Sequence, residues 1–346
     1  MRSARCLKQA LSPVRGVKVS TLCVLALTLA LLAAGSAGCA SASGDARASF
    51  SSPQTYMRVA YPDKDTVSLQ IALRRFLPER GRGPVIWLVG ASHIGEPNYF
   101  AMLQQHLDTL PLVLFEGVGA NLKKLRFDPD EQASVQYALA TSLGLAFQLS
   151  AIDYDRPQFR NSDLSIAQLQ QLLLRGSREG GSGSSTKAGQ EFQQLLQVMD
   201  GSSWLGALVH VGLKIIGSSP KLQAMTKVVL IETLGQIQGD MSQLKGVPPE
   251  IQKLLVVIIQ ERNKVVLTDL KSALRSDRPP CSLAIFYGAG HMADLEKRLR
   301  SELNYRPRGD VWLTALSVNP RQAGLSSAEL EAMRGLIKWQ LEALQP

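Results

Sequence analysis

Cysteine is scarce in this sequence. The 346 residues include four cysteines, and two of these, Cys6 and Cys23, lie in an N-terminal segment that we expect to be removed. Cys39 stands at the end of that segment, which leaves Cys281 without a partner for a disulfide. The sequence therefore excludes a disulfide-stabilised scaffold, and we expect Cys281 to be an inert thiol packed in the core.

Acidic residues are absent from residues 1–38, and this uneven distribution explains most of the positive charge. The formal net charge is +9, and more than half of it comes from basic residues near the N-terminus: Arg2, Arg5, Lys8, Arg15 and Lys18. No run of basic residues is interleaved with aromatic ones, so we expect no nucleic-acid partner. Hydrophobic residues make up 45% and charged residues 19%, which excludes a wholly disordered or collagen-like chain.

An apolar stretch at residues 22–34 follows these basic residues, and the small residues 35–38 separate it from Cys39. Because the stretch is shorter than the ~20 apolar residues that a membrane-spanning helix needs, we predict a secretory signal peptide over residues 1–38. The tetrapeptide Ser-Ala-Gly-Cys resembles a lipobox, in which the cysteine is acylated and becomes the mature N-terminus. Ser36 replaces the usual leucine, so cleavage without a lipid is the alternative.

Residues 39–54 are rich in alanine, serine and glycine, and we expect them to form a lipidated, flexible tether. The expected location is the cell envelope. The protein is predicted to be an exported, membrane-anchored lipoprotein that faces the periplasm, with the outer membrane favoured over the inner one. Its contact with the membrane is expected to run through the N-terminal lipid.

The pattern of apolar residues after the tether predicts an α/β fold. A buried strand at 85–89, a helix at 96–110 and a second strand at 112–115 form one unit with parallel strands. Further along, we expect strands at 150–154, 283–287 and 311–318, and helices at 138–147, 248–274, 293–303 and 327–346. The predicted fold class is α/β, with a mixed, largely parallel central sheet flanked by helices and a helical insertion in the middle.

Three segments follow the tether. Residues 55–175 are expected to form a first α/β half, 176–275 a flexible loop and helical insertion, and 276–346 a second α/β half. The insertion opens with a glycine- and serine-rich stretch at 176–189 that cannot support a packed element. It also contains an apolar cluster at 204–216. A lid or a membrane-touching surface would use such a cluster, but a buried helix is the favoured interpretation.

Two segments share one layout that can carry chemistry. Each is a buried strand followed by Gly-x-x-His and a helix, and the histidines are His93 and His291. In an open α/β sheet the carboxyl ends of the strands form the binding crevice, and Glu116 also follows such a strand. Two imidazoles and a carboxylate make a three-ligand site for one divalent transition metal, with a position left for water or substrate. His106 and His210 lack this layout, and we expect them to be structural.

These motifs resemble the TraB/PrgY/GumN group of bacterial proteins, which is related to the Tiki proteins described as metal-dependent proteases. The resemblance rests on the two Gly-x-x-His motifs, on Glu116 after the first of them, and on Glu-Arg-Asn at 261–263. Asp163 matches a further position of the group. The resemblance covers roughly residues 80–318 and implies the fold of the EreA, ChaN-like and TraB proteins.

The resemblance also implies roles for individual residues. His93 and His291 would bind the metal, and Glu116 would be a ligand or the general base. Arg262 and Asn263 would line the site and stabilise charge that develops on a substrate carbonyl. The implied activity is hydrolysis of a peptide or protein substrate, in which Glu116 takes a proton from metal-bound water and the hydroxide attacks an amide. The sequence has no His-Glu-x-x-His helix, so the site differs from that of thermolysin-type proteases.

The chief alternative is a non-catalytic lipoprotein that binds haem or a bare metal through His93 and His291, because one fold can serve binding as well as catalysis. Residues 288–293 also match the dinucleotide fingerprint Gly-x-Gly-x-x-Ala. Asp310 precedes its strand, however, whereas a ribose-binding acid would end one. A serine hydrolase that uses Ser92 is disfavoured because the second glycine of a nucleophile elbow is missing.

Overall fold

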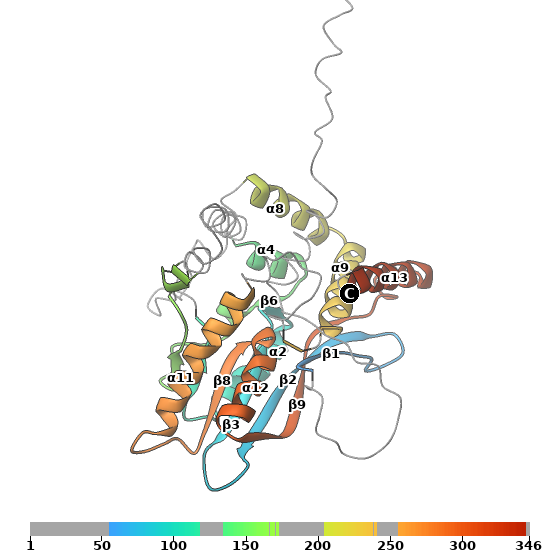
Figure 1. The fold of residues 1–346 in the computed structure, drawn as a ribbon. Helices are drawn as coiled ribbons and strands as arrows, with labels where there is room; N and C mark the ends of the chain where they lie inside the picture. The colour runs from blue at the N-terminus through green and yellow to red at the C-terminus, as the bar shows by residue number, and fades with distance from the viewer. Residues whose placement is uncertain are drawn as a thin grey trace, which may run out of the picture.

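The computed structural model describes residues 55–117, 134–165, 167–169, 171–172, 204–237, 239–240 and 255–343. These residues form an α/β fold with a mixed central sheet flanked by helices, so the predicted fold class is confirmed (Figure 1). The predicted signal peptide, the tether and the glycine- and serine-rich stretch at 176–189 lie outside the described residues. In the described part of the chain, no helix has the length and apolar character to cross a bilayer.

Four neighbouring strands form the parallel half of the sheet. In spatial order they are β3 (Val85–Ala91), β8 (Ser282–Gly288), β5 (Val113–Phe115) and β7 (Phe159–Asn161). β3 and β8 pair in parallel from Val85 opposite Ser282 to Ala91 opposite Gly288. The two Gly-x-x-His segments, which are far apart in the sequence, therefore leave the sheet side by side.

The long strand β2 (Val67–Pro78) organises the antiparallel half. It pairs with β9 (Tyr305–Val318) along most of its length, with β1 (Met57–Ala60) near its start and with β3 near its end. The sequence patterns predict neither β1 nor β2, and they place the start of β9 at residue 311 rather than at Tyr305. The consecutive arginines Arg74 and Arg75 interrupt the apolar pattern of β2 and hide it from a search for buried strands.

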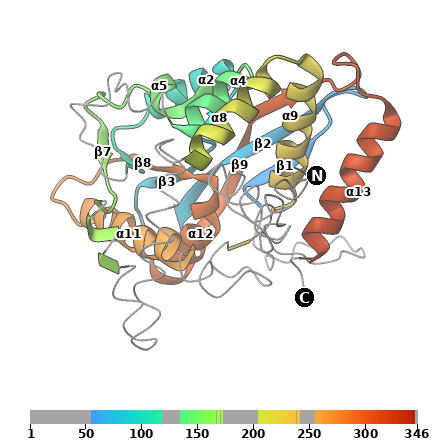
Figure 2. The same ribbon diagram turned by 90° about the horizontal axis from the view of Figure 1, so that it is seen from above.

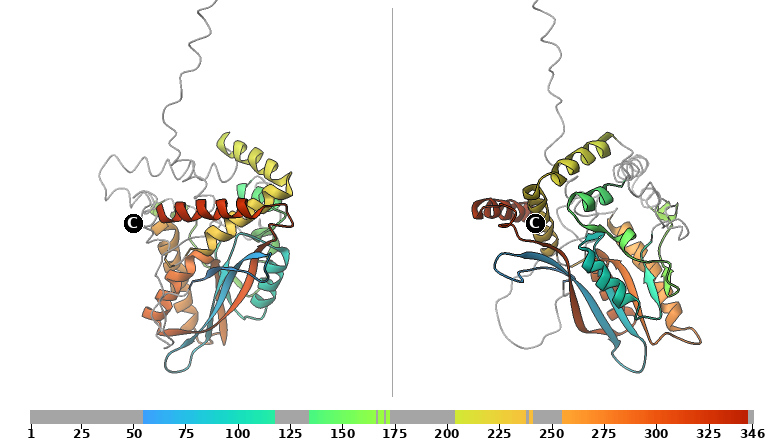
Figure 3. Two further views of the ribbon diagram at one scale, coloured as in Figure 1. Left: turned by 90° about the vertical axis from the view of Figure 1, so that its right-hand side faces the viewer. Right: turned by 180° about the vertical axis from the view of Figure 1, so that it is seen from behind.

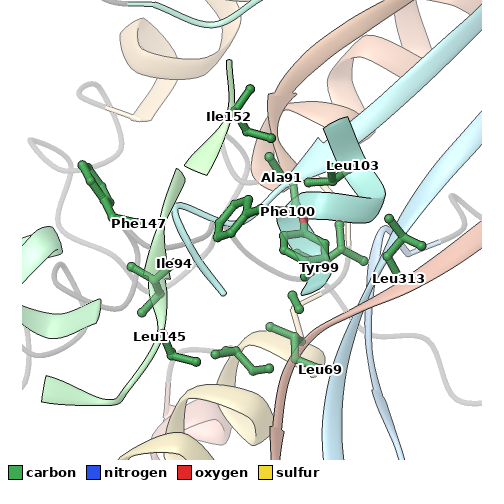
Figure 4. Packing of buried hydrophobic residues seen from close by; sticks show 14 of the residues in the cluster. Leu69, Ala91, Ile94, Tyr99, Phe100, Leu103, Leu145, Phe147, Ile152 and Leu313 are labelled. Carbon is green, nitrogen blue, oxygen red and sulfur yellow. The ribbon is translucent and has the colours of Figure 1, made fainter. Parts of the chain in front are cut away.

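Helices cover both faces of the sheet (Figure 2). One face packs against α2 (Pro97–Leu107), α4 (Val135–Ser142) and α9 (Pro220–Gly235), and the other against α11 (Arg262–Leu274) and α12 (Met292–Glu302). Successive residues of β3 point to opposite faces of the sheet. Val89 packs in the hydrophobic cluster on the first face, and Leu88 packs in the cluster on the second. In Figure 4, Tyr99 and Phe100 of α2 lie within the first cluster.

The remaining elements lie around this framework. They are β4 (Ile94–Gly95), β6 (Ala146–Phe147), α5 (Gln148–Ala151), α8 (Trp204–Gly217) and α13 (Ser327–Ala343). β4 and β6 pair as a separate two-stranded sheet. α9 contacts β1, β2, β9 and α13, so this helix of the predicted insertion packs directly on the main sheet.

Arg74 is buried without any solvent exposure and is held by a network of charges. It donates to Glu296 of α12 at 2.7 Å and to both carboxylate oxygens of Asp310 at 2.7 and 2.8 Å, and it stacks on the ring of Tyr56. The hydroxyl of Tyr56 donates to Glu296 at 2.8 Å. Because a buried cation is tolerated only when it is paired, this network explains how an arginine can occupy the middle of a core strand.

Two further expectations about the fold are wrong. Residues 150–154 do not form the third parallel strand: the helix α5 covers their start, and the strand next to β5 is β7. A short apolar run does not distinguish a strand from a buried helical turn, which explains the error. Cys281 is exposed rather than packed, because it precedes the first residue of β8 and lies outside the core.

Candidate functional site

The three expected metal ligands lie at the carboxyl ends of adjacent parallel strands. His93 comes soon after β3, Glu116 follows β5 directly, and His291 ends a short 3-10 turn after β8 (Ala289–His291). β8 lies between β3 and β5, so all three residues are at the same end of the sheet. This is the end at which open α/β sheets bind ligands.

Glu116 is the centre of the site. Its Oε1 accepts a hydrogen bond from Arg262 Nη2 at 2.6 Å and lies 3.7 Å from His291 Nε2. Its Oε2 accepts from the backbone N–H of Gly288 at 2.6 Å. The backbone N–H of Glu116 donates to the carbonyl of Phe286 at 3.0 Å. The carboxylate is therefore held by groups from α11 and from the end of β8.

Gly288 allows this close approach. A Cβ atom at this position would lie 3.3 Å from Glu116 Oε2, which is tighter than most real contacts of a Cβ atom. Glycine has no Cβ atom, so another group can approach its backbone closely. At Gly288 the group that approaches the backbone is the carboxylate of Glu116.

The surroundings of Glu116 keep it ionised. Burial alone would raise its pKa, but the positive charge of Arg262 and the N–H of Gly288 together hold the pKa of Glu116 well below its usual range. A general base works best when its pKa lies near the working pH. Of the two roles that the resemblance implies for Glu116, these charges favour the metal ligand over the general base.

A second carboxylate holds Arg262. Nε and Nη2 of Arg262 donate to the two carboxylate oxygens of Asp163 at 2.9 and 2.6 Å, and Nη2 also donates to Glu116. Asp163 has a fully buried side chain and accepts further bonds from the N–H groups of Gly117 and Leu164. Arg262 Nη1 has no hydrogen-bond partner within the described ranges. The N–H groups of Nη1 are therefore available to donate to a ligand.

The chain before Arg262 departs from α-helical geometry. Residues Val257–Glu261 form a π-helical turn, and α11 begins at Arg262. The sequence pattern predicts an uninterrupted helix here, although the β-branched residues at 256–259 disfavour a regular one. π-helical turns occur frequently at functional sites. Glu261 does not join the site and instead pairs with Lys264 at 2.6 Å on the exposed side of the helix.

Asn263 fixes the orientation of the His291 imidazole. Its Nδ2 donates to the carbonyl of His291 at 3.2 Å and to Asp294 at 2.8 Å, so its Oδ1 must be the acceptor for His291 Nδ1–H at 2.8 Å. His291 then carries its lone pair on Nε2, the atom that faces Glu116. Asn263 is 0% exposed and all its polar atoms are used. The expectation that Asn263 lines the site is corrected: it lies behind His291 and positions it.

His291 is neutral in the folded protein near pH 7. Burial lowers the pKa of His291 to about 4, although the carboxylate of Glu116 acts in the opposite direction. The side chain is 8% exposed. Neutral imidazole with a free Nε2 is the form in which histidine binds metals.

His93 borders the same site. His93 lies between β3 and β4 in the sequence and is half-buried. Its backbone carbonyl accepts a hydrogen bond from the N–H of Gln148 at 2.8 Å. A charge on the His93 imidazole lowers the pKa of both Glu116 and His291. The structure therefore brings Glu116 and His291 together and places His93 within electrostatic range of both.

A metal ion fits the chemistry of this site in part. In the ranges that the structure describes, no group of three or more His, Cys, Asp or Glu side chains is arranged to hold a metal. Two of the expected donors nevertheless have the right form: a neutral imidazole nitrogen and an ionised carboxylate oxygen, 3.7 Å apart. Tetrahedral zinc with ligands at about 2.1 Å separates its donor atoms by about 3.4 Å. The bond from His291 Nδ1 to Asn263 is also typical of metal-binding histidines.

Two residues beside the site are not among the predicted site residues. Asp294 is 4% exposed and accepts a hydrogen bond from Asn263. It lies in the first turn of α12, three residues after His291, and this spacing on one helix face could have indicated that Asp294 lies near the site. Tyr287 packs edge-on against the His291 ring with centroids 5.2 Å apart and donates its hydroxyl to the carbonyl of Ser162. Burial raises the pKa of Tyr287, so it remains a neutral donor.

The fold and this site define the class of the protein: an α/β protein in which a carboxylate, a guanidinium and an imidazole meet at the carboxyl ends of parallel strands. No protein-family model matches the chain, and neither a curated protein nor a solved structure matches it. The resemblance to the TraB/PrgY/GumN group therefore stays a prediction, and the function is argued from the site.

Proposed function

We propose that this protein is a metal-dependent peptide hydrolase of the cell envelope, exported and anchored through Cys39. The observation that carries the proposal is the arrangement of Glu116 and His291. An ionised carboxylate faces the unprotonated Nε2 of a neutral imidazole at 3.7 Å, and no hydrogen bond joins the two atoms. Two electron-rich atoms held this close are stabilised by a cation between them, which favours a metal site.

The residues around this pair have separable tasks in the proposed reaction. Glu116, His291 and His93 would hold one divalent transition metal, and the ion would supply a Lewis acid and a water of lowered pKa. Asn263 keeps the proton of His291 on Nδ1, and Asp163 holds the guanidinium of Arg262 in place. Arg262 Nη1 is the donor that would bind the carbonyl oxygen of a peptide and stabilise its developing charge.

The proposal is tested by metal content. The mature chain from Cys39 onward, purified without added metal, is compared with His93→Ala, Glu116→Gln and His291→Ala by mass spectrometry of the bound metal. His210→Ala is the matched control, because it removes a histidine from α8, outside the site. We expect about one metal per chain in the parent and in the control, and loss of the metal in the three site variants.

Activity is then measured on a peptide library with the metal-loaded protein. Cleavage that Glu116→Gln abolishes would support the hydrolase. Folded protein with no metal in any form would overturn the metal site. A haem absorption band that His291→Ala removes, without peptide cleavage, would instead identify a haem-binding lipoprotein.

A further inference from the structure

Exposed apolar side chains gather on three helices. Nine large hydrophobic residues of the described chain are exposed, and six of them lie on α8, α9 and α13: Val211, Ile215, Leu222, Val229, Leu336 and Trp339. We call this region the helical end of the molecule. Figures 1 and 3 show α8, α9 and α13 together at the upper end, above the central sheet. Most of the exposed large apolar side chains that the structure describes are therefore on these three helices.

The outer face of α13 is built like an interfacial helix. Trp339 is 65% exposed and Leu336 is 55% exposed, and their spacing of three places them on one side of the helix. Ile337 is 3% exposed and faces the protein. Arg334 lies on another side of α13, where it donates to Glu232 of α9 at 2.8 Å. An exposed tryptophan and leucine on one side of a helix whose opposite side is buried are typical of helices that lie at a membrane surface.

α8 repeats this arrangement. Val211 is 54% exposed and Ile215 is 57% exposed, one helical turn apart, with the exposed Lys214 beside them. Leu213 on the opposite side is 5% exposed and packs in the core. The sequence favours a buried helix for the apolar cluster at 204–216. The structure corrects this for the side chains it describes there, because Leu213 is buried whereas Val211 and Ile215 are exposed.

The N-terminal sequence indicates what covers these faces. The described structure begins at Thr55, and residues 40–54 separate it from the predicted acylation site Cys39. A chain of that length can span at most about 50 Å. Acylation at Cys39 would thus keep the domain beside a bilayer at a high effective concentration, so even weak insertion of a few apolar side chains is sufficient for docking.

We propose that the exposed faces of α8 and α13 dock onto the surface of a phospholipid bilayer. Val211, Ile215, Leu336 and Trp339 enter the interfacial region, and Lys214 stays at the level of the headgroups. The choice of a bilayer rests on the anchor at Cys39 in the proposed function, whereas the docking itself depends on these exposed side chains and not on hydrolytic activity. The two proposals can therefore fail separately.

Vesicle binding tests the docking surface. The mature chain from Cys39 onward is made without acyl groups and mixed with phosphatidylcholine vesicles, with or without phosphatidylglycerol, at lipid concentrations up to about the millimolar range. Binding is measured by flotation. The variants are Leu336→Ser with Trp339→Ser, and Val211→Ser with Ile215→Ser. Met102→Ser is the matched control, because Met102 is 45% exposed but lies on α2.

We expect each double variant to lower the partition coefficient by about tenfold or more and the control to change it by less than about twofold. In Trp339→Phe, binding should persist while the blue shift of tryptophan emission on adding vesicles becomes smaller. Absence of binding by the parent chain, or equal binding by all variants, would overturn the proposal. A dimer that the same double substitutions dissociate would also overturn it, because a second copy would then cover these faces.

Discussion

His291 Nδ1 donates to Asn263 Oδ1 at 2.8 Å, and this one contact decides which nitrogen of His291 faces Glu116. Asn263 has no freedom to exchange its donor and acceptor atoms, because its Nδ2 is committed to Asp294 and to the carbonyl of His291. The tautomer of a histidine at one end of the sheet is thus set from α11. Several consequences of this arrangement are measurable.

Replacing Asn263 with Leu should release His291 from its tautomer. We expect the affinity for the proposed metal to fall by about 10- to 100-fold, as is typical when an outer-shell partner of a ligand is removed. The measurement is a metal titration, with nitrogen NMR shifts of the His291 ring as the direct report of the tautomer. Thr268→Val, on the exposed side of α11, is the control. An unchanged tautomer in Asn263→Leu would contradict the positioning role.

Gly288→Ala should disturb Glu116. The new Cβ would lie 3.3 Å from Glu116 Oε2, so the carboxylate must move and its bond to the Gly288 N–H must lengthen. We expect a loss of about 1 kcal/mol in the free energy of unfolding, measured with urea. Gly335→Ala on α13 is the matched control: its Cβ meets nothing within 4 Å, and alanine should stabilise the helix by about 0.5–1 kcal/mol. Equal effects at the two positions would contradict this account.

Asp163→Asn should destabilise the protein strongly. Arg262 would keep only one carboxylate partner while remaining 6% exposed, and breaking a buried ion pair costs about 3–5 kcal/mol. Urea unfolding measures the change. Asp153→Asn is the control, because its ion pair with Arg156 is about half exposed and should contribute at most about 1 kcal/mol. If the two substitutions had similar effects, the network around Arg262 would not be a stabilising element.

The metal-free protein should lose stability on mild acidification. The folded-state pKa of His291 is lowered to about 4, while an unfolded histidine titrates near about 6.5. The contribution of neutral His291 to the free energy of unfolding is therefore fully present above about pH 6.5. It is lost as the pH falls toward about 4, and the total loss is about 3 kcal/mol. Burial also lowers the pKa of His106, which adds a contribution of the same sign.

The comparison of urea midpoints at about pH 7.5 and pH 4.5, in the presence of a chelator, measures this loss. His291→Gln should show a smaller difference between the two pH values than the parent, and His106→Gln isolates the second contribution. An identical pH dependence in His291→Gln and the parent would show that His291 is not the group responsible.

Much of the parallel half of the fold was predictable because its signals are local. Continuous apolar runs identified β3, β5 and β8, and the helices between them followed from spacings of three and four. β2 was missed because Arg74 is made compatible with burial by Glu296 and Asp310, which are more than two hundred residues away. A local sequence pattern does not show that such distant carboxylates will pair with Arg74.

The candidate site was likewise predictable only in part. The positions of His93, Glu116 and His291 at strand ends followed from the sequence, whereas the roles of their neighbours did not. Asn263 was expected to touch a substrate, but the fold turns it toward His291 and buries it. The difference arises because the amide of Asn263 is bonded to His291 and Asp294, which lie 28 and 31 residues further along the chain.

The sequence by itself determined the fold class and which backbone positions gather at the carboxyl end of the parallel strands, because both depend on hydrophobic patterns within single elements. The tertiary structure decided which groups touch there: Asp163 and Glu116 share Arg262, and Asn263 sets the tautomer of His291. These contacts join segments that are distant in the chain. Their hydrogen bonds and pKa values exist only after burial has removed water and brought the partners together.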